Sequence, residues 1–157
     1  FALEQIARDY VDVLNRVIEW KPEDLVVNMH ICRGNFRSTW FSSGGYEPVA
    51  KTLFGHCRVD GFFLEYDSDR AGDFTPLRYI KDQKVVLGLI TSKSGDLEDK
   101  GEVIARIKEA SQYVPLEQLC LSPQCGFSST EEGNILTIEA QWDKLKLIDE
   151  IVHEVWG

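Results

Sequence analysis

Two thiols, an imidazole and a carboxylate stand at the ends of successive apolar runs of the sequence. His30 and Cys32 close the first of these runs, Glu65 closes the next, and Cys125 follows a later one. A β-strand turns successive side chains to opposite faces, so two residues separated by one position point the same way. His30 and Cys32 can therefore bind the same metal ion.

The four residue types favour one kind of metal. A pair of soft thiolates with one imidazole and one carboxylate suits zinc, whereas magnesium and calcium prefer shells made of oxygen. The sequence therefore predicts one tetrahedral zinc ion bound by His30, Cys32, Glu65 and Cys125. Taken alone, His30 could be a hydrogen-bonded structural residue, and Glu65 could instead pair with Arg70.

Other candidate residues have simpler interpretations. Cys57 and Cys120 lie in or beside apolar runs and are expected to be small buried hydrophobic side chains. Asp67 and Asp69 could suggest a second metal, but such acidic runs are usually solvated turns. The segment 42–45 could hold a phosphate at a helix start, although a flexible loop is the simpler expectation.

The elements that must position the four ligands alternate between helix and strand. Helical spacing of apolar residues predicts helices over roughly the first nineteen residues, over 47–55, from about 100 to before Pro115, and through 142–155. Strands are expected at 25–32, 61–66, 85–91 and 119–121. The strands are nearly continuous in apolar residues, which is typical of parallel α/β sheets buried on both faces.

The strands start roughly every 25–35 residues, which is the repeat of a (β/α)₈ barrel. Because only four strands are visible, residues 1–157 are predicted to form one partial domain of about four βα units, equivalent to half of a TIM barrel. All four proposed ligands follow or end strands, at the edge where barrel active sites lie. A flavodoxin-like open sheet is the alternative, but no glycine fingerprint follows the first strand.

Composition limits the partners and the cellular location that can be expected for the chain. The 157 residues carry a net charge of −9, and no run rich in Lys or Arg occurs, which argues against nucleic acid and anionic membrane surfaces as partners. No apolar stretch approaches the roughly 18–20 residues of a membrane helix. Four cysteines in such an acidic chain are typical of reduced thiols, so a cytoplasmic location is expected.

Three short motifs resemble one known family. The order Met29-His30-Ile31-Cys32, a Glu that closes the next strand, and Ser122-Pro123-Gln124-Cys125-Gly126 resembles the C-terminal catalytic domain of cobalamin-independent methionine synthase. The stretch from Cys32 to Phe36 resembles the shorter bacterial paralogues that carry only the barrel. The resemblance implies the C-terminal half of a (β/α)₈ barrel that binds Zn²⁺ through the four residues named above.

The resemblance also implies an activity. The family members are zinc-dependent thiol S-methyltransferases of methionine biosynthesis, which move a methyl group from 5-methyltetrahydrofolate to homocysteine. No catalytic residue beyond the zinc ligands is expected here. The family's substrate contacts lie largely upstream, so the isolated chain is expected to be incomplete and to pair with the missing barrel half or another chain. A related alkyltransferase with another donor or thiol, and a zinc-stabilised fragment without activity of its own, are the alternatives.

Overall fold

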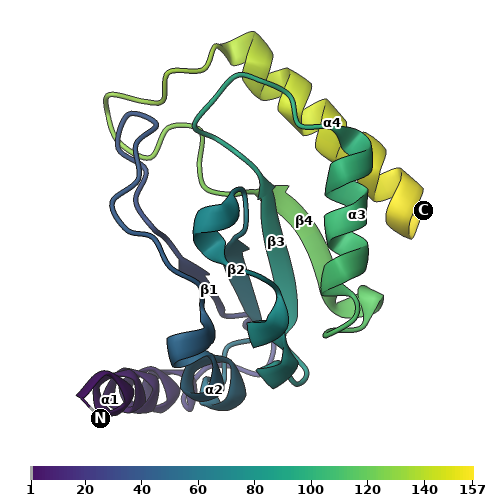
Figure 1. Ribbon diagram of the computed structural model, residues 1–157. Helices are drawn as coiled ribbons and strands as arrows, with labels where there is room; N and C mark the ends of the chain where they lie inside the picture. The colour runs from purple at the N-terminus through teal and green to yellow at the C-terminus, as the bar shows by residue number, and fades with distance from the viewer. Residues whose placement is uncertain (1) are drawn as a thin grey trace.

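The computed structural model describes residues 2–157 (Figure 1), so the part of the predicted first helix that falls on Phe1 lies outside the described residues. The α-helices are α1 (Ala2–Ile18), α2 (Glu47–His56), α3 (Lys100–Ala110) and α4 (Ile138–Trp156), and the strands are β1 (Asn28–Ile31), β2 (Gly61–Glu65), β3 (Lys84–Ile90) and β4 (Leu119–Pro123). Short 3₁₀ turns lie at Asp69–Ala71, Thr75–Tyr79 and Leu116–Gln118.

The four strands form one parallel sheet in the order β1-β2-β3-β4. Each strand pairs with the next one along the chain, with a helix or helical turns in each connection, as in a stretch of a (β/α)₈ barrel. A flavodoxin-like sheet would place the second strand outside the first. The fold class predicted from the sequence is therefore confirmed, and the flavodoxin-like alternative is wrong.

The two faces of β1 and β2 differ in burial because the helices cover one face of the sheet, whereas β3 is buried from Val85 to Ile90. In β2, Phe62 and Leu64 are buried, while Phe63 between them is 36% exposed. In β1, His30 is exposed on the same face as Phe63, its partner in the strand register. The expectation of burial on both faces is therefore wrong for β1 and β2, since the face opposite the helices is open.

The core lies between the sheet and the helices. A chain of aromatic rings crosses it, with centroids 4.5–5.8 Å apart at each step. Cys57 is 1% exposed, as expected, but Cys120 is only partly buried. The helical spacing of apolar residues from Trp142 onward predicts that Trp142 packs in the core, but it is 58% exposed, since the side of α4 that packs is centred on Ile151.

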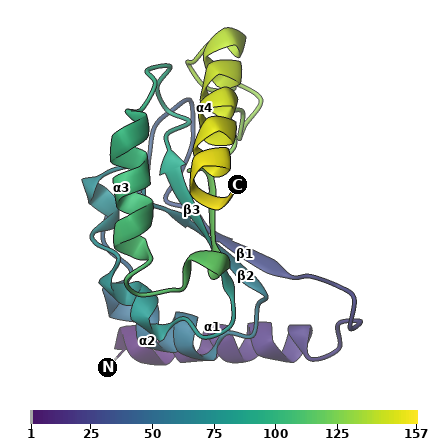
Figure 2. The same cartoon turned by 90° about the vertical axis from the view of Figure 1, so that its right-hand side faces the viewer.

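The predicted amphipathic pattern of the first helix is present, but much of its apolar surface has no cover. Val11 and Ile18 are buried where α1 lies beside α2, which both views show (Figures 1 and 2). A second set of apolar side chains on and after α1 is exposed: Leu3, Ile6, Tyr10, Val13, Val17 and Trp20. None of the described helices combines the length and apolarity that a membrane crossing requires.

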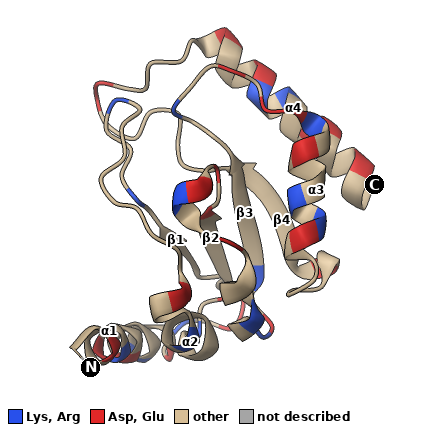
Figure 3. Ribbon diagram, in the orientation of Figure 1, with Lys and Arg blue, Asp and Glu red and all other residues tan. Residues whose placement is uncertain are grey.

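Charge is distributed unevenly between strands and helices. Figure 3 shows the sheet almost free of charged residues, whereas α3 and α4 carry both signs along their length. Within the described strands, the charged residues are Lys84, which is exposed at the start of β3, and Glu65, which is 2% exposed at the end of β2. Burying a carboxylate in a strand costs free energy unless the group has partners, so Glu65 indicates a candidate functional site at the end of β2.

Candidate metal centre

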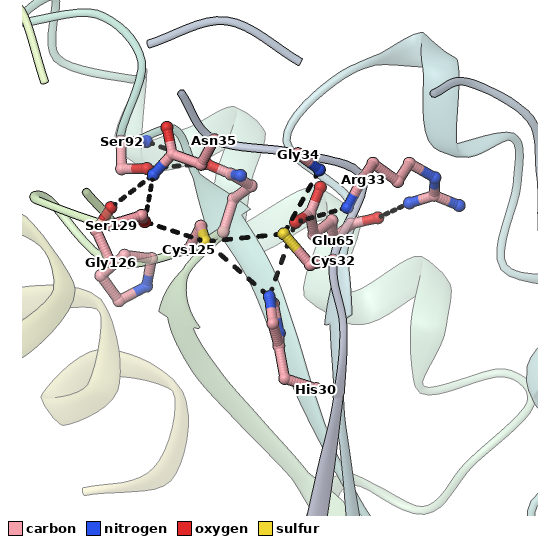
Figure 4. Close-up of polar contacts among 12 residues, drawn as sticks. His30, Cys32, Arg33, Gly34, Asn35, Glu65, Ser92, Cys125, Gly126 and Ser129 are labelled. Carbon is pink, nitrogen blue, oxygen red and sulfur yellow. Dashed lines mark hydrogen bonds and ion pairs between the residues drawn. The ribbon is translucent and has the colours of Figure 1, made fainter. Parts of the chain in front are cut away.

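His30, Cys32, Glu65 and Cys125 converge at the carboxyl end of the sheet (Figure 4). Their potential ligand atoms all lie within 4.8 Å of one another. His30 lies within β1, Cys32 follows it, Glu65 ends β2, and Cys125 lies two residues beyond β4. No second group of three or more such side chains occurs in the part of the chain that the structure describes, so the acidic turn at 67–69 supports no further metal site.

Gly88 allows Cys125 to join the other three residues. Two strand spacings of about 4.8 Å separate β2 from β4, so a side chain at the end of β4 would not reach Glu65 without a bend. The chain after β4 crosses over β3 where the register shifts between Gly88 and Ile90. A Cβ at position 88 would lie 2.8 Å from the Cα of Gln124 and 2.9 Å from the carbonyl oxygen of Leu64. The absent side chain thus lets Cys125 approach β2.

Three of the separations between these atoms are close to those of a tetrahedral site. The sulfurs of Cys32 and Cys125 are 4.0 Å apart, Cys125 Sγ is 3.8 Å from His30 Nε2, and His30 Nε2 is 3.6 Å from Glu65 Oε1. A tetrahedron with zinc bonds of about 2.0–2.3 Å has edges of about 3.3–3.8 Å. The donor set and its spacing therefore fit zinc, with only small adjustments at the two sulfurs.

The two site cysteines are free thiols with different acidities. Their sulfurs are much farther apart than a disulfide bond allows. The pKa of Cys125 falls to about 7, chiefly because the His30 imidazole hydrogen-bonds its sulfur, with further contributions from Ser129 and the Gly126 amide. Burial raises the pKa of Cys32, and the contact with Cys125 raises the pKa of His30. Cys125 is therefore the thiol that loses its proton more easily.

Glu65 is held by the segment next to Cys32 and has no contact with Arg70. Its carboxylate oxygen Oε1 accepts a hydrogen bond from the backbone N–H of Arg33 over 3.1 Å. The Arg70 guanidinium instead lies over the Trp40 ring at 4.3 Å. The alternative interpretation of Glu65 as an ion-pair partner of Arg70 is therefore not supported, and the carboxylate is directed at His30 and the thiols.

Arg33 and Tyr46 are important neighbours of the site that sequence patterns did not reveal. Arg33 is 9% exposed and Tyr46 is 3% exposed. Burial raises the pKa of Tyr46 to about 12, so its hydroxyl keeps its proton at neutral pH. An arginine directly after Cys32, followed by Gly34, is the sequence signal that could have drawn attention to this pair.

A second network joins the loops after β1 and β4. Asn35 Nδ2 donates to the Gly126 carbonyl oxygen over 2.8 Å and to Ser129 Oγ over 2.7 Å, and Ser129 Oγ is 3.6 Å from Cys125 Sγ (Figure 4). Lys93 Nζ donates to the Gly34 carbonyl oxygen over 3.0 Å. Three loops are thus tied together around the thiols, which limits how far Cys125 can move.

The fold and the site together define the class of protein: a parallel βα sheet of the barrel type with two thiols, an imidazole and a carboxylate gathered at its strand ends. No family model matches the chain. A solved structure of a putative vitamin-B12-independent methionine synthase from Listeria monocytogenes matches with 48% identity and a TM-score of 0.77, over 98% of this chain and 42% of that one. A B12-independent methionine synthase from Shewanella sp. W3-18-1, in complex with selenomethionine, shares the fold with a TM-score of 0.71 at 24% identity, over 92% of this chain and 42% of that one.

Curated sequences agree with the structures. The uncharacterized protein YxjH of Bacillus subtilis is 54% identical over 98% of this chain, and the methionine synthase of Pyrococcus horikoshii is 23% identical over 74% of it. The chain spans 41% of the length of YxjH. The predicted resemblance to part of the cobalamin-independent methionine synthase family is thereby confirmed.

Proposed function

We propose that His30, Cys32, Glu65 and Cys125 hold one zinc ion and that the centre serves methyl transfer to a thiol in methionine biosynthesis. The observation that carries the proposal is the convergence of the four ligand atoms within 4.8 Å. The similarity to methionine synthases supports the class of reaction. Homocysteine is the proposed acceptor and 5-methyltetrahydrofolate the proposed donor.

The donor set suits thiol alkylation better than hydrolysis. When bound, zinc keeps a substrate sulfur in its thiolate form at neutral pH while leaving it nucleophilic. Two thiolates, one carboxylate and a neutral imidazole give the loaded site a net charge of about −1, whereas hydrolytic sites more often use His and carboxylate ligands with fewer sulfurs. The residues of this chain thus provide charge and orientation, and none acts as a proton-transfer catalyst in the proposal.

Substrate access is proposed from the open face of the sheet. A hollow of 310 Å³ lies there, and it is lined by His30, Phe63, Gly126 and the segment from Ser122 to Cys125. The apolar Phe63 ring and the Pro123 ring beside the two metal-ligand side chains suit the aliphatic part of a small thiol. The hollow is open on one side, so other groups must complete a binding site for a complete substrate.

We further propose that the chain works together with the remaining part of a barrel. β1 and β4 are the edges of the sheet, and each presents unpaired backbone groups on its outer side. The exposed apolar side chains of α1 lie near the β1 edge, where Met29 and Ile31 line a common apolar groove with Ile6 and Tyr10. A second barrel half would cover both features, and it would supply the substrate contacts that this chain lacks.

The names of the relatives favour a second candidate function. The relatives with 54–55% identity are uncharacterized proteins, and the named methionine synthases among the curated relatives are 23–24% identical. A related zinc-dependent alkyltransferase with another methyl donor or another thiol would carry the same four ligands. The open sheet edges also leave room for a zinc-stabilised fragment without activity of its own.

A reconstitution experiment separates these functions. The chain is assayed with methyl-labelled 5-methyltetrahydrofolate and homocysteine, alone and after co-expression with the remaining portion of the Bacillus relative. We expect little labelled methionine from the chain alone and clear formation by the complex, which Cys125→Ser abolishes. A zinc-loaded complex that forms no labelled methionine would contradict this donor and acceptor pair. Substantial turnover by the chain alone would show that no essential group lies elsewhere.

A further inference from the structure

Arg33 is a buried arginine whose guanidinium contacts only neutral groups. Nη1 donates to Tyr46 Oη over 2.8 Å and to the Glu65 carbonyl oxygen over 2.9 Å, and Nη2 donates to the Gly44 carbonyl oxygen over 2.7 Å. The guanidinium also lies over the Tyr46 ring, 4.2 Å from its centroid. Within the described residues, no carboxylate lies within ion-pair distance of this guanidinium, although a buried charge usually has such a partner.

The backbone around Arg33 faces two of the proposed metal ligands. The N–H of Arg33 donates to Glu65 Oε1 over 3.1 Å, and the N–H of Gly34 donates to Cys32 Sγ over 3.3 Å (Figure 4). Gly34 has φ +99°, which L side chains rarely adopt, and a Cβ there would lie 2.6 Å from the Phe41 nitrogen. Two consecutive amides of one turn thus donate to the Cys32 sulfur and the Glu65 carboxylate, which approach each other from β1 and β2.

Tyr46 completes the backbone pairing of Glu65. The register of β1 with β2 ends at Ile31 and Leu64, so the Glu65 backbone has no strand partner on the β1 side. The Tyr46 hydroxyl takes this place: it accepts from the Glu65 N–H over 2.9 Å and lies 3.2 Å from the Glu65 carbonyl oxygen. The backbone of Glu65 is therefore held by the Tyr46 hydroxyl and the Arg33 guanidinium, in the place where a neighbouring strand would usually pair with it.

We propose that Arg33 and Tyr46 are positioning residues of the metal centre, which hold Glu65 and the turn at Arg33–Gly34 in ligand geometry before the metal binds. This inference rests on the metal centre proposed above. Groups that orient metal ligands typically change metal affinity about 10–100-fold when they are removed. Because the guanidinium binds the backbone of Glu65 and leaves its carboxylate free, it orients the ligand without competing with the metal.

A lysine could not replace Arg33 in this role. The guanidinium is a planar fork whose two terminal nitrogens contact three acceptors from three segments: the end of β2, the start of α2 and the loop between β1 and α2. An ammonium group offers its donors from a single nitrogen. Arg33→Lys keeps the charge but should release either the Gly44 carbonyl or the contacts at Glu65 and Tyr46.

The test compares two tyrosines that lie side by side. Tyr46 and Tyr66 have ring centroids 5.3 Å apart and are both buried, but the Tyr66 hydroxyl has no hydrogen-bond partner in the structure. Tyr46→Phe and Tyr66→Phe thus remove the same atom from the same aromatic cluster, and only the first removes contacts to Glu65. The variants and Arg33→Lys are loaded with Co²⁺ for visible absorption spectra and with Zn²⁺ for transfer to a chelator. Thermal unfolding of the metal-free chains is recorded in parallel.

We expect Tyr46→Phe and Arg33→Lys to bind Zn²⁺ at least about tenfold more weakly than the wild type in equilibrium competition with the chelator, with altered Co²⁺ spectra. Tyr66→Phe should match the wild type in both measurements. Unchanged spectra and zinc affinities in the first two variants, with only a lower melting temperature, would make their role structural and overturn the inference. Equal effects of Tyr46→Phe and Tyr66→Phe would also overturn it. Failure of the wild type to bind either metal would instead refute the metal centre itself.

Discussion

The loops at the strand ends and the outer surface of α1 differ in whether their side chains have partners within this chain. In the first region, the loops after β1 and β4, polar side chains from three segments bind one another around the four-residue cluster. In the second region, the exposed apolar side chains of α1, the residues have no cover: Tyr10 is 69% exposed and Val17 is 71% exposed. The four side chains of the first region already meet within this chain, whereas the second region exposes apolar side chains of the kind that protein interiors contain.

This difference separates what the chain can do alone from what needs a partner. Metal binding requires only groups that already converge, so it should survive in the isolated chain. The proposed contact with other protein rests on the exposed apolar surface of α1, because monomers rarely leave large contiguous apolar patches open. The predictions below test each side of the comparison, beginning with the largest expected effect.

Removing either thiol should abolish zinc binding. Cys32→Ser and Cys125→Ser each replace a soft sulfur ligand by a hydroxyl, which binds zinc poorly. We expect one zinc per wild-type chain and essentially none in either variant, measured by metal analysis after gel filtration. Cys120→Ser is the control, because Cys120 is a partly buried thiol outside the cluster and should leave the stoichiometry unchanged.

Full zinc occupancy in both thiol variants would show that the strand-end region is not the metal site. Loss of zinc in the Cys120 variant as well would indicate that the whole sheet must be intact for binding. Either result would contradict the contrast between the strand-end loops, which are expected to bind metal on their own, and the uncovered surface of α1.

Charging the open surface of α1 should change how the chain associates. The wild-type chain is expected to form oligomers or aggregates through its exposed apolar residues and open edges. Tyr10→Glu combined with Val17→Glu places two carboxylates on this surface and should shift sedimentation toward the monomer. Trp142→Glu on α4 is the matched control, since Trp142 is also exposed, at 58%, but lies on a different helix. A wild-type chain that sediments as a monomer would contradict the prediction.

The sequence predicted what depends on local periodicity. His30 and Cys32 could be placed together because alternation along one strand puts them on one face, and Glu65 because it ends an apolar run. The apolar pattern also gave the right helices, but not which apolar residues are buried. On α1 the buried positions are Val11 and Ile18, since contact with α2 selects them.

Other features depend on pairings across the fold that no local pattern encodes. Cys125 reaches the cluster only because Gly88, 37 positions earlier, has no side chain at the crossing. The role of Arg33 follows from its contacts with Tyr46 and Glu65, which come from other segments of the chain. Such side chains look like ordinary polar residues in the sequence, because their burial is decided by which segments meet.

An ion pair between the buried Lys144 and the partly buried Glu98 anchors the loop after β3 to α4. The Lys144 side chain is 0% exposed, and its Nζ lies 3.0 Å from both carboxylate oxygens of Glu98. Lys144→Ala leaves Glu98 without its cation, and breaking such a pair costs about 3 kcal/mol. We expect a loss of that size in the free energy of unfolding from urea titration. Lys146→Ala should change it by less than about 0.5 kcal/mol, because Lys146 is exposed and pairs only at the surface.

The smallest expected effect concerns Asp60, which directly precedes β2 and accepts a hydrogen bond from the segment before the edge strand β1. Hydrogen bonds from the Val27 backbone N–H and the Lys21 ammonium lower the pKa of this carboxyl. A lowered folded-state pKa stabilises the fold at pH values above the ordinary Asp pKa, and that contribution is lost as the pH falls through the lowered value. The carboxylate is 38% exposed, so after solvent screening Asp60→Asn should cost no more than about 1 kcal/mol at pH 7. The difference between wild type and variant should shrink steadily as the pH is lowered below about 4. Urea titrations of both proteins across this range measure it, and a difference that stays constant with pH would show that the Asp60 charge does not hold the segment before β1.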